Sequence, residues 1–399
     1  MRYKHLLSSG VAALTLVVSA SAHAEGDGMR LGDGSARMKY GVDVTEGYDD
    51  NIYATRDEEV GALKSSIKPY ISFEMDRQDS FYSASLYLDA LFYSGASQND
   101  SVDYQIAFLV DEVFNSRNRL KVDFDYGRYT ETRSFDDQEI LPRYDGGNFA
   151  ARYGFGSKEV FFNFDLYTRY GVKEYNAGNT SKDSRDLKFG WEGFFKVAST
   201  LDGVLDIRLS DLRYVNDADS DVKVTTVLGG LQWQSTAKTT GHIKVGVQRQ
   251  NSRADYRRTR PSIEVGATWS PQTYMVFRFI AENGFGLDSQ SGEFTQYNKI
   301  GFNWDHTWSD HWSTNFDMAY LDEDLIAGTA AGGVQAGEIL LNRQLQEYTL
   351  KGTYKIVRWA DVHVGYTFSN RDANDEGRIA NANDIYTRNY AFIGANIGF

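Results

Sequence analysis

The chain has 399 residues, a formal net charge of −13, 14% aromatic residues, 37 glycines, 4 prolines and no cysteine. Its mean hydropathy of −0.48 is too low for a bundle of membrane helices, and after residue 24 no run of 18 apolar residues occurs. The aromatic and glycine content argues against a disordered chain, and the acidic balance argues against nucleic acid as a partner.

Residues 1–24 have the pattern of a secretory signal peptide. Arg2 and Lys4 precede the apolar run "LLSSGVAALTLVVSA", and "AHA" (22–24) is a small-x-small cleavage site. We therefore divide the chain into a signal peptide (1–24), a short periplasmic leader (25–35) and one β-domain (36–399). Removing two basic residues and no acidic one changes the formal charge from −13 to −15.

Apolar and polar side chains alternate along most of the remaining chain. In "RLKVDFDYGRY" (119–129) every second residue is apolar, and the same alternation occurs at 81–93, 201–212 and 343–357. A β-strand directs successive side chains to opposite faces, so each of these strands has one apolar and one polar face. Pro69 lies inside the second strand and cannot donate a ladder hydrogen bond, so we expect a bulge or weak pairing there.

Two kinds of connection alternate between the strands. Eight are short, near 76–80, 115–118, 157–158, 199–200, 235–238, 271–272, 309–311 and 358–359. Nine are mostly longer and more acidic, near 49–61, 94–101, 134–143, 175–183, 216–220, 251–254, 286–293, 326–342 and 372–383. Seventeen connections join eighteen strands. The sequence thus predicts an all-β, transmembrane, antiparallel up-and-down β-barrel of about 18 strands (16–18), with periplasmic short turns and extracellular long loops.

The aromatic residues support this orientation. Six tryptophans lie at or beside short turns, whereas Tyr48, Tyr53, Tyr93, Tyr129, Tyr175, Tyr214 and Tyr297 lie near long loops, as in the two aromatic girdles of a membrane barrel. The chain ends in "GANIGF", whose Gly394, Ile397 and terminal Phe399 resemble the C-terminal assembly signal of outer-membrane proteins. We therefore expect an outer-membrane location in a Gram-negative bacterium, with lipid, lipopolysaccharide and the barrel-assembly machinery as partners.

No constellation of catalytic groups is evident, and we predict that the protein is not an enzyme. His242, His306, His311 and His363 all fall at the short-turn ends of strands, and no GxSxG elbow occurs. The acids of "EGYDDNIYATRDEE" (46–59) could hold a divalent cation but lack the spacing of a calcium loop, so we predict a solvated extracellular loop, no metal and no cofactor. The glycine-rich segment 328–337 is expected to be an outer loop or a segment that folds into the mouth.

The polar faces of the strands supply the candidate pore-lining residues. These are Lys121, Asp123, Asp125, Asp165, Arg169, Asp206, Arg208, Lys244, Asp317 and Lys351. A barrel of eighteen strands is wide enough for an aqueous channel unless loops obstruct it. Mixed charges with scattered tyrosines suit a hydrated, sugar-like solute, although any water-filled barrel would have such a lining.

The opening "GVDVTEGYDDNIYATRDEEVGALKSSIKPYISFEMD" resembles the type 2 outer-membrane β-barrel porin family associated with exopolysaccharide and capsule export loci. The matching features are the "YDDNI" tip (48–52) and Pro69 with Ile71 in the returning strand. The resemblance implies a passive conduit for a secreted surface polysaccharide, working with a periplasmic polysaccharide-export protein. The alternatives are a general or sugar-specific uptake porin and, third, a barrel enzyme.

Overall fold

The computed structural model describes residues 28–32, 34–131, 141–157, 159–176, 178–216, 221–236, 238–252, 257–287, 294–326, 339–374 and 385–399. These residues form nineteen strands and two 3₁₀ turns: β1 (Met29–Arg30), β2 (Ala36–Asp49), β3 (Ala62–Arg77), β4 (Ser80–Tyr93), η1 (Ser97–Asn99), β5 (Ser101–Asn115), β6 (Asn118–Thr130), β7 (Arg143–Phe155), β8 (Phe162–Tyr175), η2 (Thr180–Lys182), β9 (Ser184–Ala198), β10 (Leu201–Tyr214), β11 (Val222–Thr236), β12 (Thr239–Ser252), β13 (Arg257–Gln272), β14 (Met275–Leu287), β15 (Phe294–Thr307), β16 (Trp312–Ile326), β17 (Ile339–Val357), β18 (Ala360–Asn374) and β19 (Tyr386–Gly398). None of the helices among them is long and apolar enough to cross a membrane.

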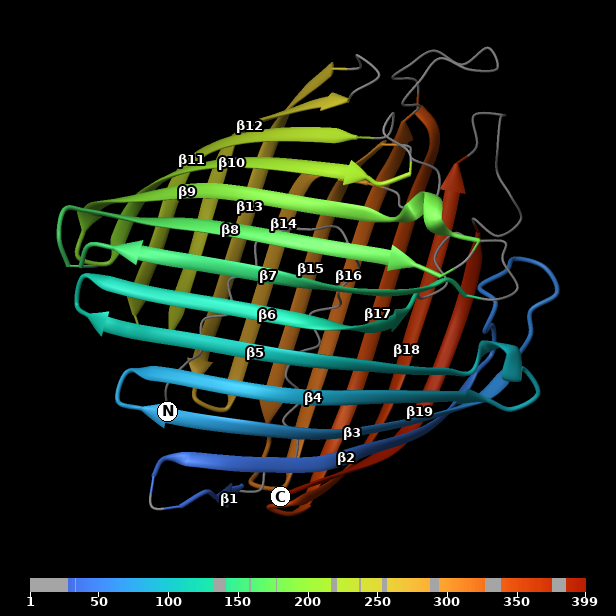
Figure 1. The fold of residues 1–399 in the computed structure, drawn as a ribbon. Coiled ribbons are helices and arrows are strands. Elements are labelled where there is room, and N and C mark those ends of the chain that lie inside the picture. Colours follow the sequence, from blue (N-terminus) through green and yellow to red (C-terminus); the bar gives the residue numbers. More distant parts are fainter. Residues whose placement is uncertain are drawn as a thin grey trace.

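Strands β2 to β19 form one closed antiparallel barrel, in which each strand pairs with its neighbours in sequence and β19 pairs with β2. Figure 1 shows β4 to β10 crossing the near wall and β13 to β18 running steeply behind them. The predicted fold and strand number are therefore confirmed. The two-residue strand β1 pairs with the start of β2, inside the segment predicted as a leader.

The strand register defines an inner and an outer face. The outer face carries apolar side chains that remain 40 to 62% exposed, such as Val44, Phe108, Phe149, Val245 and Ile393. The inner face carries most of the charged residues. Lipid contact explains the exposed apolar side chains, because backbone groups in a closed barrel are satisfied by the ladder and only side chains meet the membrane.

The break expected at Pro69 occurs, but without a bulge. The β3–β4 register is the same on both sides, with Ile67 opposite Ala90 and Tyr70 opposite Tyr87, and only Lys68 and Pro69 are unpaired with β4. Proline has no amide hydrogen to donate, so weak pairing is confirmed and the bulge is wrong.

Aromatic residues form a belt at the short-turn end. Phe399 stacks on Trp359 and Tyr40 with ring centroids 5.4 and 5.5 Å apart, so the C-terminal residue sits where the last strand closes on β2. At the long-loop end the girdle prediction is partly wrong. Tyr175, Tyr214 and Tyr297 lie there but face inward and are buried.

Small buried apolar clusters occupy the long-loop end of the interior. Their members are Ile52 with Ala62 and Ala96, Ala54 with Leu345 and Tyr386, Val222 with Ile326, and Leu325 with Leu341 and Ala373. These clusters pack strand ends and connections against one another, so the buried apolar packing of the described residues lies near the mouth.

Candidate functional site on the inner wall

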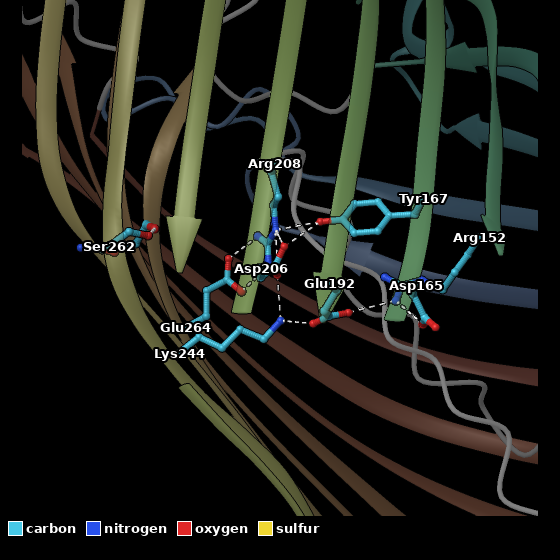
Figure 2. A network of polar contacts seen from close by, with 10 residues as sticks. Arg152, Asp165, Tyr167, Glu192, Asp206, Arg208, Lys244, Ser262 and Glu264 are labelled. Carbon is cyan, nitrogen blue, oxygen red and sulfur yellow. Dashed lines mark hydrogen bonds and ion pairs between the residues drawn. The ribbon is translucent and has the colours of Figure 1, made fainter. Parts of the chain in front are cut away.

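A network of paired charges runs along the inner wall from β6 to β13, and Figure 2 shows its centre. Arg119 of β6 and Arg152 of β7 both bind the Asp165 carboxylate of β8, with N–O distances of 3.1 and 3.0 Å. Arg152 also lies 3.0 Å from Glu192 of β9. Each carboxylate therefore links cations from different strands.

The network continues through Lys244 of β12. Lys244 pairs with Asp206 of β10 at 2.9 Å and with Glu192, so its side chain crosses β11 to reach two carboxylates. Arg208 of β10 binds Asp206 and donates to Glu264 of β13 at 2.8 Å. The eight charged groups are four cations and four carboxylates, which sum to zero: Arg119, Arg152, Arg208 and Lys244 against Asp165, Glu192, Asp206 and Glu264.

Tyr167 joins the two halves of the network. Its hydroxyl donates to Asp206 at 3.0 Å and accepts from Arg208 Nε at 3.1 Å, while the Arg152 guanidinium lies 4.7 Å from its ring centroid. The ring lies over Gly190 of β9, where an added Cβ would come 2.1 Å from Tyr167 Cζ. A glycine at this position is therefore required for the tyrosine to lie flat against the wall.

The middle of the network is buried. Asp206 is 1% exposed, and Glu192 and Lys244 are each 7% exposed. Charges removed from water are costly unless they are paired and hydrogen-bonded, and each of these has at least two opposite-charge contacts. The wall here is a polar surface whose charges balance.

All ten predicted pore-lining residues lie on the inner face. Four of them, Asp165, Asp206, Arg208 and Lys244, belong to the network. The others lie apart from it: Lys121 is 3.9 Å from Asp123, Asp125 and Arg169 share Asn148, Asp317 accepts from Asn303, and Lys351 is on β17. That any of them lines a solute route remains a proposal.

The ten pore-lining candidates do not include four residues of the network: Arg119, Arg152, Glu192 and Glu264. The alternation of "FAARYGF" (149–155) around Phe149, Ala151 and Tyr153 places Arg152 on the polar face, so this residue could have been found. Glu192 could have been found in the same way, because Leu187, Phe189 and Trp191 alternate with the residues on its own face of β9.

The connection between β2 and β3 does not lie as predicted. We expected the acids of residues 46–59 to face the medium, but Asp49 and Asn51 are fully buried and Asp50 is partly buried. Asp57, Glu58 and Glu59 are exposed, as expected. The segment thus has a buried first half and a solvated second half.

The buried half is fixed to β19. Arg388 binds Asp49, with Nε 3.0 Å from both carboxylate oxygens, and Asn51 donates to the Thr387 carbonyl at 3.0 Å. Ala54 packs against Leu345 of β17 and Tyr386 of β19, both on the inner face. The segment therefore leans inward across β19 to β17 and covers part of the mouth.

The four histidines lie at one end of the barrel. His242, His306, His311 and His363 lie toward the short-turn end, and the His306 ring packs against Trp308 at a tilt, with ring centroids 3.8 Å apart. Within the described part of the chain, no three His, Asp or Glu residues are placed to hold a metal ion. The segment 328–337 lies outside the described residues.

No family model and no curated protein matches the chain, so the resemblance of residues 41–76 to the polysaccharide-associated family gains no support from these comparisons. Among solved structures, the FrpB iron transporter of Neisseria meningitidis is similar in its F3-3 variant, with 11% identity and a TM-score of 0.50 over 88% of this chain and 65% of that one. The F5-1 apoprotein form gives 9% identity, a TM-score of 0.50, and 90 and 81% coverage.

OccK2 (OpdF) of Pseudomonas aeruginosa is 10% identical, with a TM-score of 0.46 over 92% of this chain and 99% of that one. The chain spans about two thirds of the FrpB F3-3 chain, at 65%. Identities this low establish the fold alone. The fold is that of an outer-membrane β-barrel.

Proposed function

We propose that the protein is an outer-membrane channel of a Gram-negative bacterium through which small hydrophilic solutes diffuse. The observation that carries the proposal is the closed barrel of eighteen strands with an apolar outer face and a charged inner wall. Barrels of sixteen to eighteen strands typically leave an aqueous channel. The solved structures with this fold include an iron transporter, which agrees with a transport role.

The inner wall favours neutral, hydroxyl-rich solutes such as small sugars. Its central charges cancel within the network, so they offer hydrogen-bond donors and acceptors without a net field. Sugar hydroxyls can exchange with such paired groups, including the Tyr167 hydroxyl that lies between Asp206 and Arg208. An ionic solute would have to disrupt pairs that already satisfy each other.

Purified protein in planar bilayers and in liposomes tests this function. We expect discrete conductance steps with little selectivity between anions and cations, and liposome swelling in monosaccharides that declines with solute size. A membrane that remains sealed to salt and to monosaccharides would refute the channel.

A second candidate is the secretion of a surface polysaccharide beside a periplasmic export protein, favoured by the resemblance of residues 41–76. Deleting the gene would then abolish surface polysaccharide while cytoplasmic polymer precursors continue to form. Normal surface polysaccharide in the deletion strain, together with slower sugar uptake, would decide for the uptake porin.

A further inference from the structure

Strands β13 and β14 are not joined by backbone hydrogen bonds in the half of their length that lies nearest the long loops. Pairing runs only from Glu264 opposite Glu282 down to Gln272 opposite Met275. Above Glu264, residues 257–263 pair with β12 alone, and residues 283–287 pair with β15 alone. Among the described strands this is the longest stretch in which two adjacent strands both continue without pairing to each other.

Side chains close this seam in place of the ladder. The Asn283 amide accepts from the Ile263 amide at 2.7 Å and donates to the Pro261 carbonyl at 3.2 Å. Arg260 donates to the Gly284 carbonyl at 2.9 Å, and Gln248 of β12 accepts from the Phe285 amide at 3.2 Å. Backbone groups without hydrogen-bond partners are costly beside lipid, and here side chains supply partners for backbone groups of both strands. The two strands can therefore separate at this place by breaking a few side-chain hydrogen bonds instead of a continuous backbone ladder.

Arg260 passes from one face of the wall to the other. Its Cα lies on the inner face, because Gln248 and Lys244 stand opposite Arg260 and Glu264. Its guanidinium nevertheless binds Asn298 Oδ1 at 3.2 Å and lies 5.7 Å from the Phe285 ring, and both of these belong to the outer-face set of β14 and β15. A cation thus lies in the seam itself, with lipid-facing Ile263 on one edge and Phe285 on the other.

A buried polar position lies on the inner face of β12, one strand away from the seam. Gln250 of β12 is 1% exposed, and neither of its amide atoms has a hydrogen-bond partner. It stands opposite Arg258, whose Nη1 is also unpartnered. Buried polar groups are nearly always satisfied, so these atoms are suited to a ligand that enters from the seam.

We propose that the β13–β14 seam is a lateral opening that admits an amphiphile with an anionic head and an alkyl tail. Arg260 takes the head, Gln250 and Arg258 bind it on the lumen side, and the tail extends between Ile263 and Phe285 into the outer leaflet. This route is separate from diffusion along the barrel axis.

The absence of cysteine permits a direct test with a diazirine-bearing decyl phosphate as the probe. Photolabelling of the wild type in lipid vesicles should fall on 257–263 and 283–287. The pair Ile263→Cys/Asn283→Cys lies one step beyond the last paired residues, so its disulfide would pin the two edges where they separate. Oxidation should reduce labelling at least five-fold, and reduction of the same sample should restore it.

The matched control is Val227→Cys/Val247→Cys, a directly opposed pair in the fully paired β11–β12 interface, whose oxidation should leave labelling unchanged. Without any disulfide, Arg260→Ala should lower labelling at least three-fold, whereas Arg249→Ala, an exposed arginine on neighbouring β12, should not. Labelling spread over the whole lipid-facing surface, or equal labelling in the oxidised and reduced pair, would overturn the opening. Salt conductance of the same proteins measures the axial channel separately. A protein that conducts no salt would refute the proposed function, whereas the labelling result would still decide on the lateral opening.

Discussion

Replacing Lys244 by methionine tests the inner-wall network at its centre. The change keeps the length of the side chain and removes one cation that binds both Glu192 and Asp206. A charge-assisted hydrogen bond contributes about 1.5–3 kcal/mol net, and removing one partner of a buried pair costs about 3–5 kcal/mol. Arg152 still binds Glu192 and Arg208 still binds Asp206, which places the expected loss of unfolding free energy near the low end, at about 3 kcal/mol.

The assay is denaturant unfolding in lipid vesicles, followed by tryptophan fluorescence. Lys351→Met is the control, because Lys351 also lies on the inner face but interacts with the surrounding aspartates without a close ion pair among the described residues. Adding Glu192→Gln to Lys244→Met should recover part of the loss, since the double variant removes the carboxylate left without its lysine. Equal unfolding free energies for the two single variants would refute the reasoning.

Two further changes have clear expected outcomes. Gly190→Ala should displace the Tyr167 ring and destabilise the barrel by about 1–3 kcal/mol. The control Gly352→Ala has no atom within 4 Å of its added Cβ and should leave the stability unchanged. The unfolding midpoints of the two variants test this difference. Arg388→Ala should release the inward-leaning segment by leaving the buried Asp49 carboxylate unpaired, so single-channel conductance and trypsin cleavage after Arg56 should both increase. The control Arg213→Ala breaks an exposed pair with Asp211 and should change neither; unaltered cleavage in Arg388→Ala would show that this pair does not hold the segment.

Strand positions were predictable because alternation is a local property of the chain. In each strand the apolar and polar residues alternate, and short turns recur between the strands. The barrel fold and the ten inner-face residues can therefore be predicted without knowledge of any contact between strands. The grouping of those residues does not follow in this way. Lys244 reaches Glu192 across two intervening strands, a contact that depends on the curvature and stagger of the closed barrel.

The loops and the seam were hidden for related reasons. Acidic residues in a connection usually stay hydrated, but Asp49 is buried because Arg388 lies on β19, which only barrel closure brings beside β2. The tyrosines at the long-loop end lie at the predicted positions along their strands. Position along a strand does not determine whether a side chain faces the lipid or the interior. The seam depends on Pro261 and on Asn283 acting together, and neither residue alone marks a break in pairing.

The contacts of the "YDDNI" tip bear on what its family resemblance can mean. Asp49 binds Arg388, Asp50 accepts from the Asn389 amide at 2.7 Å, and Asn51 binds the Thr387 carbonyl, so three successive residues tie the end of the first barrel strand to the last one. These interactions stabilise the closure of the barrel and do not contact the charge network. A segment that serves this purpose carries information about how the barrel closes rather than about its cargo. The resemblance is therefore weaker support for polysaccharide secretion than its sequence specificity suggests, and the neutral inner wall is the better guide to the solute.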